Sequence, residues 1–403
     1  MMAVPDLQKG GGHFFNLFYV EQKRRLLTTH FSFLGFLKYT RVVVEKERLM
    51  PEFFDTKQAE ELRANNPHIF YVDAFPRQIR ELFFIDNTTF IGTDKAAVFA
   101  SQDFSAYVQS KEDEHVHVYY PWNYHLVKTV TARDYFRLKT NRNQDLITAD
   151  EQKKLADFRV AVLGMSVGSN IAFILTQAGI SRNITLADFD ELDTTNLNRI
   201  FAGVHQIGLN KTIVAAQHIY EDNPFAEVIA LQDGINEENL NSLLSQKKID
   251  CIVEEIDDIP FKIKTRLLAR EYRIPVVMIT DNGDGVVLHV ERYDLGHEKI
   301  FGKDTKYFGN ALSGEPLNRQ RAGKIIMEDI VGGAARVDPK MLASVQRVFK
   351  KELVSWSQLG SAAMLGGVMA TYAIKQIVLG SDKESDIRAY IHPAQFSHGS
   401  HTS

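Results

Sequence analysis

The chain has little cysteine and no uninterrupted apolar segment of membrane-spanning length. It carries one cysteine, Cys251, among 403 residues, which excludes a disulfide framework and a cysteine-rich zinc site within one chain. The longest apolar stretch, Ser361 to Gly380, is interrupted by Lys375 and Gln376. Its alanines and glycines favour a closely packed core helix over a membrane span. We therefore expect no membrane partner and a reducing, cytoplasmic setting.

The chain also lacks a strong charge imbalance. Its formal net charge is -4, which provides no global attraction for nucleic acid, so we expect no nucleic-acid partner. Charged residues make up 24% and hydrophobic residues 44%, which is typical of a soluble globular protein. The segment Met1 to Gly12 has no apolar core and does not resemble a secretory signal. The tail from His398 to His401 is expected to be flexible.

From about residue 131 the sequence alternates apolar runs with amphipathic segments. This alternation predicts an α/β fold with a doubly wound, mainly parallel, Rossmann-like sheet. The expected helices cover residues 168–179, 208–221, 236–246 and 259–272. The expected strands are Arg159–Leu163, Asn183–Ala187, Glu227–Leu231, Asp250–Glu254, Pro275–Thr280 and Val286–Val290.

The remaining regions are less regular. Residues 1–130 predict a mixed α+β domain that either recognises a substrate or buttresses the second domain, which we place at 131–382. Within that N-terminal region we expect a helix at Asp55–Asn65 and strands at Ile69–Val72, Thr88–Ile91 and Val116–Tyr120. Phe301 to Val337, rich in glycine and charge, predicts a long crossover loop. Residues 383–403 are expected to add a strand, Lys383–Ile391, and a tail.

One strand–turn–helix unit carries the main functional signal. The apolar run that ends at Leu163 leads into Gly164-Met-Ser166-Val-Gly168, and a helix follows. The N–H groups and dipole of a first helical turn form a site for an anion such as phosphate. A second strand ends about twenty residues later at Asp188, where nucleotide-binding α/β units place an acid against ribose. The pattern therefore predicts a nucleotide site.

The turn by itself is ambiguous. It is one residue shorter than the dinucleotide fingerprint G-x-G-x-x-G and has serine in the middle, so it is weak evidence for a nicotinamide cofactor. The same letters spell G-x-S-x-G, the nucleophile elbow of serine hydrolases, with Ser166 as nucleophile. His289 and His392 are available as bases, but neither has a convincing context.

The surrounding residues resemble the ThiF family of adenylating enzymes, which includes the ubiquitin-activating enzymes. The resemblance covers residues 135 to 380, approximately. Within the family, the chain looks most like the ThiF module of ThiF–nitroreductase fusion proteins. It rests on an ordered set of motifs: Tyr119-Tyr-Pro-Trp122, Arg142-Asn-Gln with Glu151-Gln152, the turn at Gly164, Asp188-Phe-Asp190, Asn196-Leu-Asn198-Arg199, Gly208-Leu-Asn-Lys211, Glu254-Glu255-Ile256-Asp257 and Trp356-Ser-Gln-Leu-Gly360.

The resemblance implies ATP and Mg²⁺ as cofactors and a role for each motif residue. Arg199 and Lys211 would bind phosphates, and their charges suit that role. Asp257 would hold Mg²⁺, which prefers carboxylate oxygen. In a family homodimer, Arg142 would be an arginine finger supplied by the partner subunit. The nucleotide pocket would be lined by Gly164, Ser166, Gly168, Asp188, Asp190, Asn196, Arg199 and Lys211.

Each of these residues also has a purely structural interpretation. Arg199 and Lys211 are compatible with solvated surface charges, and Asp188 with the cap of a turn. Asp257 is compatible with the N-cap of the helix expected from about 259. Lys139 and Arg137 lie near Arg142 and compete for its role. Ser166 is compatible with a small residue that lets backbone approach phosphate.

Cysteine usage narrows the activity that the resemblance implies. Ubiquitin-type activators carry a thioester-forming cysteine in the crossover segment, whereas here Cys251 lies on a predicted buried strand. We therefore expect ATP-dependent adenylation of a carboxylate, without a thioester relay or structural zinc. The carboxylate would belong to a small acid, a peptide or a carrier protein. The alternatives are a serine hydrolase and a non-catalytic nucleotide-binding scaffold.

Overall fold

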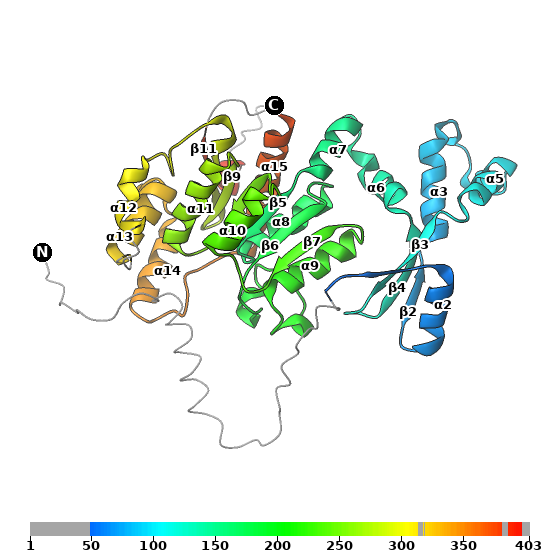
Figure 1. Cartoon of the computed structure of the whole chain (residues 1–403), viewed down its shortest axis with the longest axis horizontal. Coiled ribbons are helices and arrows are strands. Elements are labelled where there is room, and N and C mark those ends of the chain that lie inside the picture. The colour runs from blue at the N-terminus through cyan, green and yellow to red at the C-terminus, as the bar shows by residue number, and fades with distance from the viewer. Residues whose placement is uncertain (1–48, 313–316, 318, 381–385, 397–403) are drawn as a thin grey trace, which may run out of the picture.

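The structure, a computed structural model, describes residues 49–312, 317, 319–380 and 386–396. The expectations for Met1–Gly12 and for the tail at His398–His401 lie outside these described residues, as do residues 383–385 of the expected last strand. The described part of the chain forms two sheets, of four and seven strands (Figure 1).

The larger sheet confirms the predicted fold class. Its order is β11-β10-β9-β8-β5-β6-β7. The five strands from β5 to β9 pair in parallel, and β10 and β11 complete one edge as antiparallel strands. The strands are β5 (Val160–Leu163), β6 (Asn183–Ala187), β7 (Glu227–Leu231), β8 (Cys251–Glu254), β9 (Val276–Asn282), β10 (Gly285–Glu291) and β11 (Ile387–Ile391).

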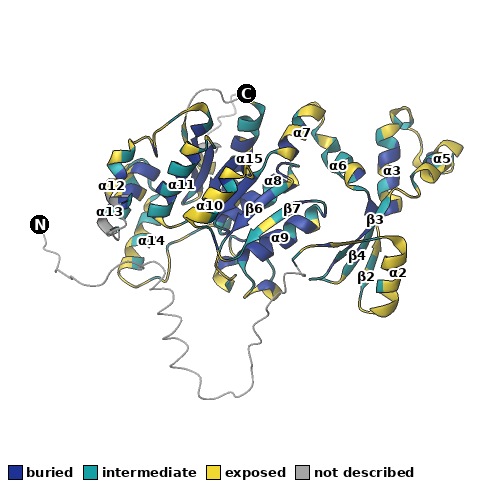
Figure 2. Ribbon diagram, in the orientation of Figure 1, coloured by how far each residue is buried: buried dark blue, intermediate teal, exposed yellow. Residues whose placement is uncertain are grey.

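Helices cover both faces of this sheet, so its central strands are buried (Figure 2). On one face, Val162 and Val253 share a core with Ile171 of α8 and Ala363 of α15. On the other face, Ala161 and Ile252 pack with Leu240 of α10. The first face is covered by α8 (Val167–Gln177), α9 (Lys211–Asp222) and α15 (Gly360–Leu379), and the second by α10 (Glu237–Ser245) and α11 (Ile259–Glu271).

Helix α15 contains the Ala-Gly-rich stretch. Among the described helices it is long and apolar enough to span a membrane by length and composition, and 44% of its apolar window is buried. A Cβ built on Gly366 would lie 2.6 Å from Ile279 Cγ2 of β9, and one on Gly367 would lie 2.6 Å from Ile174 Cδ1 of α8. The small residues therefore let α15 pack closely against the sheet and α8.

The smaller sheet lies in the N-terminal region. Its order is β1-β3-β4-β2. The expected helix near 55–65 and the strands near 69 and 116 are present, but Thr88–Ile91 is not a strand. It contains a 3₁₀ turn, η2 (Thr88–Phe90), in which the backbone N–H of Phe90 donates to Asn87 O at 3.1 Å. The elements are β1 (Glu52–Phe54), α2 (Thr56–Asn65), β2 (Phe70–Asp73), α3 (Phe75–Asp86), α4 (Lys95–Phe99), α5 (Gln102–Lys111), β3 (His115–Tyr120) and β4 (His125–Val130).

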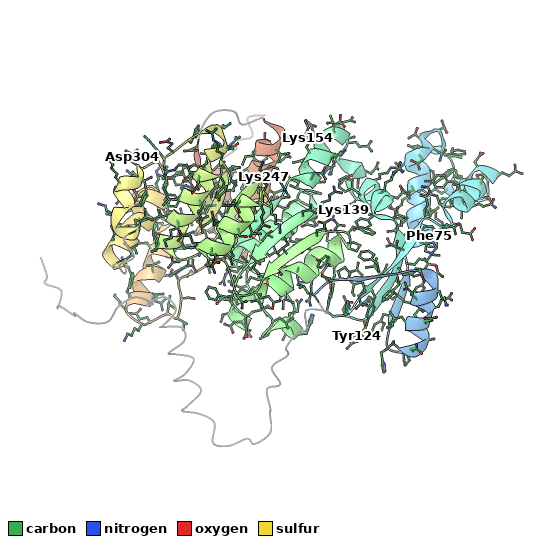
Figure 3. The ribbon with its side chains drawn as sticks, viewed as in Figure 1. Phe75, Tyr124, Lys139, Lys154, Lys247 and Asp304 are labelled. Atoms are coloured by element: carbon green, nitrogen blue, oxygen red, sulfur yellow. The ribbon has the colours of Figure 1, made fainter. Side chains whose placement is uncertain are left out.

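The N-terminal region packs against the far end of α9. Trp122 Nε1 donates to Glu221 Oε1 at 2.7 Å, and Lys139, in the connection that leads on to β5, pairs with Asp222. Figure 3 labels Lys139 between the two sheets. Phe53 stacks on Phe225 with 5.6 Å between ring centroids. These contacts buttress the helix whose first residue is Lys211. The connection to β5 runs through α6 (Ala132–Thr140), η3 (Asn141–Asn143) and α7 (Ala149–Asp157).

The expectation of a long irregular loop over Phe301–Val337 is wrong for much of that segment. Buried Phe308, Ile325 and Ile330 pack with Ile263 of α11 and Met278 of β9, so tertiary contacts order short helical turns that lack an amphipathic repeat. These are η7 (Thr305–Phe308), α12 (Gly309–Leu312), α13 (Arg319–Lys324), the π-helical η8 (Ile325–Ile330) and η9 (Ala334–Arg336), followed by α14 (Pro339–Phe349).

Candidate functional site

The glycine turn brings backbone close to backbone at the start of α8. Gly164 has φ +96°, and a Cβ there would lie 2.6 Å from Glu255 O. A Cβ on Gly168 would lie 2.8 Å from Val162 Cγ1. Ser166 is the N-cap of α8, and its own side chain makes no capping hydrogen bond. This turn therefore has the form of an anion site, with uncapped amides at the carboxyl end of β5.

Asp188 lies at the end of β6, beside that turn. Its carboxylate accepts hydrogen bonds from Met165 N at 2.7 Å and Asp190 N at 2.8 Å. It does cap a turn, as the structural interpretation expected, but two carboxylate oxygens have further acceptor capacity. Burial raises the pKa of Asp188, and the ammonium of Lys211 partly offsets this shift. Asp188, the acid that the sequence pattern predicts, is therefore close enough to Lys211 to feel its charge.

Lys211 is held at the start of α9 and is not a solvated surface charge. It is 8% exposed, and its Nζ lies 2.7 Å from Asp190 Oδ2. Asn210 caps α9 by accepting from Thr212 N at 2.9 Å. The Asn210 amide also donates to Asp188 O at 3.0 Å. The cap therefore fixes the lysine relative to the end of β6.

Arg199 lies against the glycine turn. Its Nε donates to Ser166 Oγ at 3.0 Å, and its guanidinium also donates to Thr195 O at 3.1 Å. Asn170 of α8 donates to Arg199 O at 2.8 Å, which ties the arginine's loop to the same helix. Asn196 is buried and accepts from Asp193 N at 2.9 Å. In this structure the side-chain oxygen of Asn196 therefore shapes the loop that presents Arg199.

Asp257 follows β8 at the same edge of the sheet. The N-cap of α11 is Asp258, which accepts from Phe261 N at 2.7 Å, so the capping interpretation of Asp257 is wrong. Asp257 is exposed, yet the surrounding protein raises its pKa, with Lys262 and Lys211 offsetting part of the shift. Asp257 is therefore accessible to a ligand at this edge of the sheet.

The donor set at Asp257 fits Mg²⁺ bound with phosphate. In the described part of the chain, no three His, Cys, Asp or Glu side chains form a metal cluster. Mg²⁺ commonly takes only one or two carboxylates and completes its shell with water and substrate phosphates. A single carboxylate at the same sheet edge as Arg199 and Lys211 meets that requirement.

Arg142 lies away from the other site residues of its own chain. It is exposed in η3, and Thr140, two residues before it, contacts the far end of α8: a Cβ on Gly179 would lie 2.9 Å from Thr140 Cγ2. Helix α8 has 11 residues and is therefore about 16 Å long. The glycine turn is at its other end, so the structure does not bring Arg142 to the site within one chain.

Sequence reasoning missed an acid at this edge. Asp281, near the end of β9, is 7% exposed, and neither carboxylate oxygen has a hydrogen-bond partner among the described residues. Burial raises its pKa to about 6, although Arg199 lowers it. The sequence did offer one signal for Asp281: it lies at the carboxyl end of an expected strand of the parallel sheet. Ligands of such sheets bind at that edge.

A second missed feature is a buried charge network behind β8. Arg266 donates to Glu254 Oε2 at 2.7 Å and to Glu291 Oε2 at 2.6 Å, and Lys262 lies 3.0 Å from Glu254 Oε1. Burial by itself would raise the pKa of Glu254, but the two cations outweigh it and hold the pKa below its usual value. The network anchors α11 beneath the loop that carries Asp257.

Cys251 is fully buried on β8, as predicted. Burial raises the pKa of its thiol, so the reactive thiolate is disfavoured.

The histidines proposed for a serine hydrolase are engaged elsewhere. His289 is buried and its Nε2 lies 2.8 Å from Ile330 O. Burial lowers its pKa to about 3. His392 Nδ1 accepts from Ala394 N at 3.1 Å. The hydroxyl of Ser166 meets Arg199 instead, so the hydrolase alternative is not favoured.

Several curated proteins are similar to this chain. An uncharacterized protein of Mycobacterium tuberculosis is 32% identical over 269 residues, covering 66% of this chain and 36% of that protein. Ubiquitin-like modifier-activating enzyme 5 of Arabidopsis thaliana is 35% identical over 98 residues, covering 24% of this chain and 22% of that enzyme. The tRNA threonylcarbamoyladenosine dehydratase of Bacillus subtilis is 32% identical over 139 residues, covering 34% and 54%. The chain thus spans only about a third or less of the first two relatives.

Solved structures with a similar arrangement include the E. coli tRNA N6-threonylcarbamoyladenosine dehydratase in complex with AMP. It has a TM-score of 0.46 and 19% identity, covering 63% of this chain and 99% of that one. The model of the ThiF family matches residues 138–400, a range that contains the glycine turn, Asp188, Asp190, Arg199, Lys211 and Asp257. The chain belongs to the ThiF family.

Proposed function

We propose that this protein adenylates a carboxylate with ATP and releases pyrophosphate. The observation that carries the proposal is the convergence, at the carboxyl edge of one parallel sheet, of an uncapped phosphate turn with Arg199, Lys211, Asp188 and Asp257. The ThiF family match and the relatives named as activating enzymes support it.

The reaction follows from the charges at the site. A carboxylate oxygen of the substrate attacks the α-phosphorus of ATP, the bond from that phosphorus to the pyrophosphate oxygen breaks, and an acyl-adenylate remains. Both reactants are anionic, so cations must offset their repulsion and the charge that develops on pyrophosphate. Arg199 can bind phosphate through its guanidinium, and Lys211 supplies a compact charge. The remaining acceptor capacity of Asp188 suits ribose hydroxyls, and Asp190 and Asn196 would line the same pocket.

Asp257 would hold Mg²⁺, which would neutralise phosphate charge when bound. Replacement of Asp257 with Asn should lower the rate of Mg²⁺-dependent ATP–pyrophosphate exchange by roughly 10²-fold or more. The matched control is Asp258→Asn, because Asn is as good an N-cap as Asp and α11 should stay in place. Exchange at the wild-type rate in the Asp257 variant would remove this assignment. Tight ATP binding without exchange, across acids and peptides, would favour a scaffold instead.

We propose that the working form is a homodimer in which Arg142 serves the partner's site. Its distance from the glycine turn of its own chain leaves it without a function there in cis. An exposed apolar stripe on α15, formed by Met364, Val368 and Tyr372, offers a surface for a second copy. Phe201 is also 66% exposed and stacks on Phe173 of α8, the helix beside α15.

Complementation tests this arrangement. A chain with Arg142→Ala and a chain with Lys211→Ala should each be inactive. After subunit exchange, half of the dimers are mixed, and one site in each mixed dimer has both residues intact. About a quarter of wild-type activity should return, since a C₂ interface presents the same patch twice. A fully active monomer by light scattering, or no recovery despite verified exchange, would contradict a role in trans.

Three further assignments belong to the same proposal. The acyl-adenylate passes directly to its acceptor without a thioester on Cys251. The domain limits are about 130 and 382, with the N-terminal region as a buttress of α9 or a recognition module. The protein works in the cytoplasm, on a small acid or on the C-terminus of a peptide or carrier protein.

A further inference from the structure

Asp281 is a buried acid at the edge of the sheet where the proposed chemistry takes place. It is 7% exposed, and no described residue donates a hydrogen bond to either of its oxygens. A carboxylate removed from water without donors is costly. A ligand that supplies the missing donors is one recognised reason for such a group to be kept at a site.

The side chain is directed toward the phosphate side of the molecule. In a strand, residues two apart share a face, so Asp281 lies on the same face as Ile279. That face meets the first turn of α8, because the Cβ position of Gly366 lies 2.6 Å from Ile279 Cγ2 and 3.6 Å from Val167 Cγ1. Arg199, bonded to Ser166 at the cap of α8, is also the cation that acts on the Asp281 carboxylate.

The order of the strands places the acyl substrate on this side. The ends of β5 and β6 are occupied by the glycine turn and by Asp188 with its neighbours. The ends of β8 and β9 remain. Val253 of β8 pairs with Val277 of β9. Asp281 lies four residues beyond Val277 and still on β9, whereas Asp257 lies four residues beyond Val253, in the loop that follows the end of β8 at Glu254. When the substrate's carboxylate attacks the α-phosphate near Asp257, the substrate atoms next to that carboxylate would therefore lie near Asp281.

Once ionised, Asp281 is a buried negative charge to which no described residue donates a hydrogen bond, and such a group favours a cation. Asp257 lies in the loop after the neighbouring strand β8, and the carboxyl group of Asp338 lies over the turn after β9, 2.5 Å from a Cβ built on Gly283. Arg199 acts on the Asp281 carboxylate through its charge and donates no hydrogen bond to it. An ionised carboxylate shielded from water binds a charged donor more strongly than a neutral one. On the basis of the proposed adenylation, we propose that Asp281 selects acyl substrates that carry a positively charged nitrogen close to the carboxylate to be activated.

Two sources of this nitrogen are distinguishable by matched substrates. One is the α-ammonium of a free amino acid, compared with its N-acetyl derivative. The other is the side chain of a C-terminal lysine or arginine of a peptide, compared with norleucine or citrulline at the same position. With the full chain, ATP–pyrophosphate exchange should favour the charged member of one pair by roughly 10- to 100-fold in kcat/KM.

The variant Asp281→Asn should bring that ratio close to one, mainly through a higher KM for the charged substrate. The control is Asp284→Asn, an exposed acid on the same turn, which should keep the wild-type ratio. Folding is checked by thermal denaturation of both variants.

The possible results separate this inference from the proposed function. Equal exchange of charged and neutral acids by the wild type would overturn the role of Asp281 while adenylation stands. A uniform loss in Asp281→Asn with a raised Mg²⁺ requirement would identify a metal ligand and overturn the inference as well. Exchange with no acid at all would overturn adenylation itself, and the selection of substrate with it.

Discussion

Replacement of Asp281 with Asn should stabilise the folded protein at neutral pH. Burial raises the pKa of this carboxyl from 3.8 to about 6 despite the nearby Arg199. The folded state therefore holds a proton that the unfolded state has already lost between about pH 4 and pH 6. Stability contributed by the protonated acid is complete below the unfolded pKa and is lost as the pH rises through the folded pKa.

The magnitude follows from the size of this shift. One pKa unit corresponds to about 1.4 kcal/mol, so a shift of about two units costs the folded state roughly 3 kcal/mol above pH 7. Asn has the shape of the protonated acid and cannot ionise. We expect Asp281→Asn to gain roughly 3 kcal/mol at pH 8 and close to nothing at pH 4, relative to the wild type.

Urea unfolding of both proteins across pH 4 to 8 measures this difference, with unchanged slopes as the criterion for comparable unfolding. The exposed Asp284→Asn control should stay within about 0.5 kcal/mol of the wild type throughout. If the difference between Asp281→Asn and the wild type is the same at pH 4 and pH 8, the carboxylate is not a buried, unpaired charge and the reasoning fails. A variant that gains stability while losing substrate selection would show that the acid is kept for function.

Three other substitutions test the structure. Arg266→Met should destabilise the fold by about 3–5 kcal/mol in urea, because it leaves two buried glutamates without their shared cation; a neutral effect would show that the network is dispensable. Gly164→Ala should reduce ATP affinity measured by calorimetry, whereas Gly92→Ala should bear only the cost of its positive φ, since a Cβ at Gly92 meets nothing within 4 Å. Equal affinities would refute the close approach at the turn. Cys251→Ala should retain exchange, because a buried cysteine acts as a small hydrophobe; a lost thiol-sensitive acyl intermediate would instead reveal a relay.

Much of the large sheet was predictable from local pattern. The expected ranges for β6 and β7 match the structure, and those for β5 and β8 differ by one residue at the start. Buried parallel strands consist of short apolar runs, and helices between them show their own period, so both signals are local. The glycine turn was predictable for the same reason, because its geometry needs glycine at Gly164.

Local pattern failed where long-range contacts decide conformation. The β-branched run at Thr88–Ile91 resembles a strand, yet it forms a turn after α3 because no neighbouring strand pairs with it in the described structure. The short helical turns after Phe301 exist because Phe308 and Ile325 bury against α11 and β9. The sequence of a segment does not reveal the distant strand or helix against which it packs.

The sequence by itself determined the fold class, the family and the order of the site motifs, because each depends on residues close together in the chain. Only the tertiary structure decided which acid caps α11 and where Arg142 lies relative to the glycine turn of its own chain. It also decided that Asp281 is buried and accepts no hydrogen bond from the described part of the chain. These properties depend on residues far apart in sequence. The charge that acts on Asp281 belongs to Arg199, 82 positions earlier in the chain, and the helix that packs against the same face of β9 begins at Gly360. Burial and charge pairing arise when such segments pack together, so only the assembled sheet edge reveals them.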